Sequence, residues 1–172
     1  MRTLPSAHRV RRLLAAGACL AALAIGPAAT PAAADDLSLV KSVQLHAQRL
    51  EPRAKTLSTA LARYAKAPTD RARAGRASRA AGAVRREVSS FRAALRYDRS
   101  NSAEGRQLRT ALLGALADVR SGTATLESGL ARVARRTASL ATLRALQAAQ
   151  RTLERGLRNG EKAVRRILAA AT

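Results

Sequence analysis

Residues 139–171, SLATLRALQAAQRTLERGLRNGEKAVRRILAAA, carry the clearest periodic pattern in the chain. Their apolar and small residues recur at alternating steps of three and four, which places them on one face of an α-helix. This stripe consists of Leu143, Leu146, Gln150, Leu153, Leu157, Gly160, Val164, Ile167 and Ala171. Arginine and lysine occupy the rest of the helix surface. Because an isolated helix of this kind is marginal in water, the pattern predicts that the stripe packs against other helices.

Two earlier segments show the same periodicity. The first covers about 37–66 in the heptad spacing of a coiled coil, and Pro52 falls opposite its apolar stripe, which predicts a kink or a restarted turn. The second covers about 70–98. Its stripe consists of Ala74, Ala77, Ala81, Val84, Val88, Phe91 and Leu95. Pro68 and Asp70 predict the turn between the two segments, because proline ends a helix and aspartate caps the next one.

The rest of the chain is too long for a single helix. We expect it to begin where Asn101 is followed by Glu104, a spacing that resembles a capping box. From there the apolar stripe continues but changes phase, and one helix of about 70 residues would be anomalous. We therefore expect a break at 136–139. The stretches 121–123 and 159–160 are the alternative breaks.

These patterns predict an all-α fold. Nothing in the sequence alternates with period two over a useful length, so strands are not expected. Helices joined by short turns lie antiparallel, which gives an up-and-down bundle of long amphipathic helices. The bundle has four arms if the chain breaks at 136–139, and three arms remain the alternative.

The first 34 residues have the pattern of an export signal. Four arginines precede an uncharged run at 13–25, and alanines up to Ala34 supply the small residues that a signal peptidase recognises. We expect cleavage before Asp35, which makes residues 1–34 a signal peptide and residues 35–172 one basic helical-bundle domain. The apolar run is shorter than the roughly 18 residues of a membrane-spanning helix, so no transmembrane anchor is expected after cleavage. Paired arginines in the signal leave twin-arginine export open beside general secretion.

The predicted domain is strongly basic and has no cysteine. The chain has 32 Lys and Arg residues against 11 Asp and Glu residues. Four of the basic residues and none of the acidic ones lie in the first 34 positions, so 28 and 11 remain and the net charge is +17. The one cysteine, Cys19, also lies in the predicted signal. The domain therefore has no disulfide and must be held together by burial alone.

The residue inventory of the domain argues against an enzyme. It has one histidine, His46, and no motif for a phosphate loop, a zinc protease or a serine hydrolase. His46 adjoins an apolar stripe, where we expect a partly exposed structural histidine. Glu104, Asp118 and Glu127 are widely spaced, which favours three surface acids over a cation site. We expect no catalytic residue, no cofactor and no metal.

The positive charge is the feature with functional content. The guanidinium group of arginine can bind two oxygens of a phosphate or carboxylate at once. Many such positive charges on one surface also attract anions over a distance. The second segment has the highest net charge, and its arginines are the candidate polyanion-binding residues: Arg71, Arg76, Arg79, Arg85, Arg86, Arg92 and Arg96. The expected ligands are anionic envelope polymers, anionic lipid head groups or nucleic acid. Nucleic acid would bind without sequence specificity, because aromatic residues for base stacking are few.

A second interpretation assigns the helices themselves the function. In this interpretation the arginines solvate the exterior of a bundle that binds a helical protein partner or a second copy of itself. Their number then reflects codon usage in a GC-rich genome rather than ligand binding. Both interpretations place the protein outside the cell, either secreted or associated with the cell envelope.

Overall fold

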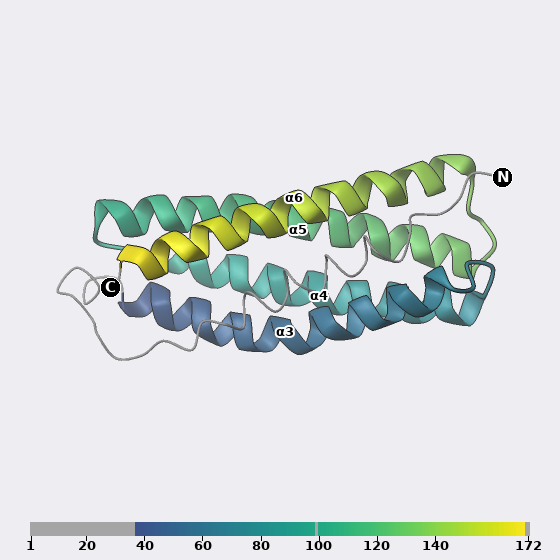
Figure 1. Ribbon diagram of the computed structural model, residues 1–172, viewed down its shortest axis with the longest axis horizontal. Helices are drawn as coiled ribbons and strands as arrows, with labels where there is room; N and C mark the ends of the chain where they lie inside the picture. The colour runs from purple at the N-terminus through teal and green to yellow at the C-terminus, as the bar shows by residue number, and fades with distance from the viewer. Residues whose placement is uncertain (1–36, 99, 171–172) are drawn as a thin grey trace.

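A computed structural model describes residues 37–98 and 100–170, and this part of the chain consists of four α-helices without a strand (Figure 1). These are α3 (Leu37–Ala65), α4 (Arg71–Tyr97), α5 (Ala103–Ala134) and α6 (Leu140–Ala170). Successive helices run in opposite directions (Figure 1). The all-helical prediction and the four arms are confirmed. The predicted signal peptide, with its cleavage site at Ala34, lies outside the described residues.

The turn between α3 and α4 lies where the sequence predicts it. Asp70 is the N-cap of α4, and its carboxylate accepts a hydrogen bond of 3.0 Å from the backbone N–H of Arg73. That bond lowers the pKa of Asp70, because it stabilises the charged carboxylate. The guanidinium of Arg73 adds an ion pair at 2.9 Å.

Replacing Asp70 with alanine is expected to lower the melting temperature by about 2–4 °C at pH 7, because α4 loses its cap. The pKa of Asp70 is lower in the folded state, so its contribution is present above its unfolded pKa of about 3.9 and is lost as the pH falls through the folded pKa. The two melting curves should therefore converge at acid pH. Circular dichroism at pH 7 and pH 3 measures both effects. Thr69→Ala is the control, and a constant gap at both pH values would contradict the prediction.

α3 continues as one helix through Pro52, so the proline does not end the element, and its side chain is exposed, as expected opposite the apolar stripe. One local prediction is wrong, because Asn101 is not the cap of the third helix. Ser102 is the N-cap instead, and its hydroxyl accepts a hydrogen bond of 2.8 Å from the backbone N–H of Gly105. Serine caps a helix as well as asparagine does, and only the backbone path decides which of two neighbours is used.

The break between α5 and α6 is confirmed. α5 ends at Ala134, α6 begins at Leu140, and the alternative breaks at 121–123 and 159–160 lie inside these two helices. Arg136 has a φ angle of 60°, a left-handed conformation that commonly ends a helix. The chain therefore turns here without the glycine that would have marked the position in the sequence.

Leucine and alanine make up most of the core. The whole predicted stripe of α4 is buried, from Ala74 to Leu95, and it lies at the centre of the bundle. The predicted stripe of α6 is only partly buried. Leu153 is 6% exposed, whereas Leu143 is 42% exposed. Buried positions of α6 also include Ala149 and Ala163. The stripe packs against a neighbouring helix, as expected, but part of it stays exposed because α6 packs mainly against α5 alone.

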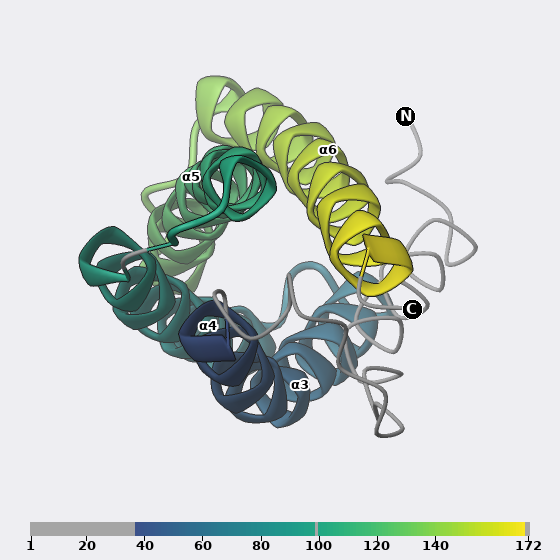
Figure 2. The ribbon, with the colours of Figure 1, turned by 90° about the vertical axis from the view of Figure 1, so that its left-hand side faces the viewer.

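The helices pack in chain order. α5 with α6 and α4 with α5 form the largest interfaces, α3 with α4 forms a smaller one, and α3 has almost no contact with α6. Viewed from its end, the bundle shows α3 and α6 apart on either side of its axis (Figure 2). Among the described residues, α3 and α6 therefore do not cover each other. Among the described residues, no helix combines the length and the apolar character needed to cross a membrane.

Candidate functional site

The seven arginines predicted as a polyanion-binding set do not form one surface. Five of them are exposed along α4: Arg71, Arg76, Arg79, Arg86 and Arg96. The other two, Arg85 and Arg92, are partly buried on the side of α4 that faces α5. A helix with arginines all around its exposed surface cannot direct all of them at one ligand. The site therefore has to be built from neighbours in space.

Arg85 is engaged in holding the bundle together. Its Nε donates to Glu127 of α5 at 2.6 Å, and the two side chains are 35% and 29% exposed. Ser78, also on α4, donates to the backbone carbonyl of Glu127 at 2.8 Å. Because its charge is already paired with a carboxylate, we exclude Arg85 from the candidate site.

Arg92 lies against two other arginines. The pKa of Arg92 is lowered, first by burial and then by repulsion from Arg96 of its own helix and Arg120 of α5. Its Nε is buried and has no hydrogen-bond partner. Within the described residues, no carboxylate forms an ion pair with any of these three side chains. We call Arg92, Arg96 and Arg120 the arginine cluster.

Ser89 connects the two helices beside this cluster. The Nε of Arg120 donates to the Ser89 hydroxyl at 3.2 Å, and that hydroxyl donates to the backbone carbonyl of Arg85 at 2.9 Å. The serine thereby fixes one edge of the Arg120 guanidinium and leaves its remaining N–H groups available. The cluster therefore places three neighbouring guanidinium groups together without a carboxylate ion pair among the described residues.

Arg120 and Ser89 were not predicted as site residues. If residues of α4 and α5 are paired by counting equally far along the chain on both sides of Ser100, Arg92 lies opposite Leu108 and not near Arg120. The offset between α4 and α5 depends on how their side chains interdigitate, which the sequence does not reveal. The one available signal was that Arg120 is a basic residue between the buried positions Val119 and Gly122 of α5.

His46 is buried, not partly exposed as expected. It is 5% exposed and packs between α3 and α4, where its Nδ1 lies 3.0 Å from Oε1 of Glu87. Its ring stacks on Phe91 with centroids 4.9 Å apart. Arg53 of α3 binds the second oxygen of Glu87. Every charged group here has an internal partner, so the arrangement serves packing.

The three acids considered as a cation site lie apart. Asp118 binds Arg155 of α6 through two hydrogen bonds of 2.8 and 3.0 Å, and Glu127 binds Arg85. Glu104 is exposed in the first turn of α5. In the part of the chain that the structure describes, no group of three or more His, Cys, Asp or Glu residues is arranged to hold a metal ion.

Comparison of the chain with protein-family models, with curated proteins and with solved structures finds no match. A functional assignment therefore rests on the charge and geometry of the bundle itself.

Proposed function

We propose that this protein is exported and binds anionic polymers of the cell envelope through its arginines, without catalysing a reaction. The observation that carries the proposal is the arginine cluster, where three like charges lie near one another and none forms an ion pair with a carboxylate among the described residues. Such a group is destabilised by its own repulsion, and a bound phosphate or carboxylate relieves it. The domain charge of +17 attracts polyanions to the site.

The exposed arginines of α4 extend the contact beyond the cluster. A polymer chain that places one anionic group in the cluster can place further groups along the same helix, against Arg79 or Arg86. Each additional contact releases condensed counterions, so affinity grows with polymer length and falls with salt. Lipid head groups and nucleic acid offer the same phosphate oxygens, and they are the competing ligands in any test.

The triple variant Arg92→Gln, Arg96→Gln and Arg120→Gln is expected to bind polyphosphate at least tenfold more weakly at 100 mM salt. Each lost phosphate contact removes about 0.7–0.9 from the slope of log affinity against log salt, so the slope should flatten by roughly 2–3. Fluorescence titration at several salt concentrations measures both quantities. Parallel titrations with polyglutamate, anionic vesicles and single-stranded DNA compare the sources of anion.

The matched control is Arg132→Gln, Arg144→Gln and Arg151→Gln, which removes the same charge from exposed positions of α5 and α6. If both triple variants lose affinity equally, binding is diffuse and the cluster is not the site. If no polyanion binds in a salt-dependent manner, the function itself is wrong. Binding to the folded form should also raise the melting temperature at constant ionic strength.

One observation favours the second interpretation, a module that binds another helix. The apolar stripes of α3 and α6 are left partly uncovered because these two helices do not pack together. This surface lies on the side of the bundle away from the α4–α5 interface, so the two functions do not exclude each other.

A further inference from the structure

One end of the bundle is formed by the α3–α4 turn and the α5–α6 loop. Both connections lie at this end because successive helices run in opposite directions (Figure 1). A Cβ atom on Gly75 of α4 would lie 3.9 Å from the Cβ atom of Ala134 of α5, so the start of α4 lies against the end of α5. We call residues 63–73 and 132–144, which surround the two connections, the basic end.

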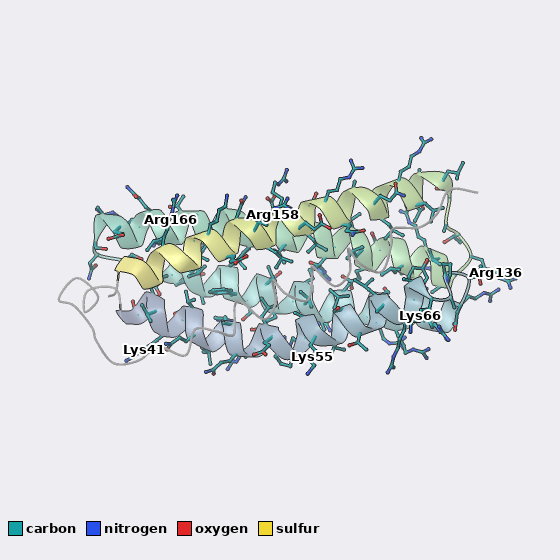
Figure 3. The ribbon with its side chains drawn as sticks, viewed as in Figure 1. Lys41, Lys55, Lys66, Arg136, Arg158 and Arg166 are labelled. Carbon is teal, nitrogen blue, oxygen red and sulfur yellow. The ribbon has the colours of Figure 1, made fainter. Side chains whose placement is uncertain are left out.

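The basic end carries more positive charge than its length predicts. Its 24 residues contain eight Arg and Lys and one Asp, a net charge of +7. An even spread of the charge of +17 over residues 35–172 would give about +3 for 24 residues. The one acid, Asp70, is paired with Arg73. The other seven basic residues are exposed: Arg63, Lys66, Arg71, Arg132, Arg135, Arg136 and Arg144. Figure 3 shows Lys66 and Arg136 at this end of the bundle.

Exposed leucines lie beside this charge. Leu140, the first residue of α6, is 75% exposed, and Leu143, in the same first turn, is 42% exposed. Because the Cα–Cβ bonds of a helix tilt toward its N-terminus, Leu140 points toward the α5–α6 loop and the end of the bundle. Arg144 follows Leu140 by four residues, so the two lie on one face of α6. The basic end therefore combines exposed apolar side chains with a surrounding group of positive charges.

We propose that the basic end binds the surface of a bilayer that contains anionic lipids. The arginines contact the phosphates of the head groups, and Leu140 enters the boundary between head groups and acyl chains. A soluble polyanion would neutralise the same arginines but would leave the leucines in water, whereas a bilayer provides a partner for both. The basic end shares no residue with the arginine cluster, so the proposal does not rest on the proposed function.

The first test measures how the purified full chain partitions onto vesicles of phosphatidylcholine with about one quarter phosphatidylglycerol, by co-sedimentation. Arg135→Gln combined with Arg136→Gln should weaken partitioning about twentyfold, because each basic residue near an anionic surface strengthens binding about fivefold. The control is Lys41→Gln combined with Arg166→Gln, which removes the same charge at the opposite end of the bundle (Figure 3). It should bind within about threefold of the wild type, because its charges lie beyond the screening length of the contact. Every variant keeps residues 1–36, so any contribution of that segment is common to all.

The second test separates a bilayer from a soluble polyanion. Leu140→Gln leaves the charge unchanged and should weaken partitioning about tenfold, because the leucine loses its apolar partner, while polyphosphate binding stays the same. Leu140 is already 75% exposed, so the variant should fold as the wild type does, which its melting curve verifies. The control is Leu45→Gln. Leu45 is 46% exposed but lies about 30 Å along α3 from the end at Ala65, so its replacement should leave partitioning unchanged.

Three results would overturn the proposal. Equal losses from the two double variants would show that the attraction is spread over the whole domain. Equal partitioning of Leu140→Gln and Leu45→Gln would show that the leucines do not enter the bilayer. Loss of polyphosphate binding in the Arg135 and Arg136 double variant, with vesicle binding intact, would assign the basic end to a soluble polymer instead.

Discussion

Glu87→Ala will destabilise the protein by about 3 kcal/mol, the largest effect that we expect from a single side chain. The Glu87 side chain is 6% exposed. Its Oε1 lies 3.0 Å from Nδ1 of His46, and its Oε2 forms an ion pair with Arg53. Removing one member of a buried charged network costs about 3–5 kcal/mol, because the remaining groups lose their partner. The lower end applies here, because Arg53 is 43% exposed and can turn to solvent. Urea denaturation followed by circular dichroism measures the loss.

A compensating variant tests the cause of that loss. His46→Leu combined with Glu87→Leu removes the buried polar pair together, and apolar side chains of similar volume often replace such a pair at no cost. The double variant should therefore regain most of the stability. The control is Asp118→Ala, which breaks an exposed pair with Arg155 and should shift the melting temperature only slightly. If Glu87→Ala melts like Asp118→Ala, the buried network does not stabilise the bundle.

Gly156→Ala will destabilise the protein by about 2 kcal/mol, although alanine is the better helix former. A Cβ atom at this position of α6 would lie 2.9 Å from the backbone carbonyl oxygen of Ala115 and 2.9 Å from a methyl carbon of Val119. Both belong to α5, so α6 must move away from its main neighbour. Gly122→Ala should act in the same way from the other helix, because its Cβ would lie 2.6 Å from Leu153.

Gly114→Ala is the matched control for the glycine variants. It lies in the same helix as Gly122, but a Cβ there would meet nothing within 4 Å. It should stabilise the protein by about 0.5–1 kcal/mol, the ordinary gain of alanine in an exposed helix interior. Equal stabilisation by Gly114→Ala and Gly156→Ala in urea denaturation would show that α5 and α6 do not approach closely at these glycines.

The fold was largely predictable because each helix signals its own boundaries. Asp70 after Pro68 stops one helix and caps the next through short-range hydrogen bonds, and the stripe of α4 follows a strict period. Where the prediction was wrong, at Asn101, the competing cap was the neighbouring Ser102. Such choices between neighbours depend on the path of the loop, which local sequence does not specify.

The candidate site was predictable only in its charge. The sequence identified the basic helix and two members of the cluster, Arg92 and Arg96, but neither Arg120 nor the pairing of Arg85 with Glu127. Both depend on the offset between two antiparallel helices. That offset results from the interdigitation of many small side chains, each with a weak preference.

The sequence alone determined what depends on local and compositional physics: long amphipathic helices, the turn at Pro68 and Asp70, and a high positive charge. The tertiary structure alone decided which faces are covered. Periodicity marks the stripe of α6 as apolar, but it cannot say how many neighbours cover it, and Leu143 stays exposed because α6 packs on α5 and almost not on α3. In the same way, the composition gives the number of arginines, but only the packing of the helices decides that the Nε of Arg92 has no hydrogen-bond partner. Burial and pairing are properties of two surfaces together, whereas a helical stripe or a net charge belongs to one segment by itself.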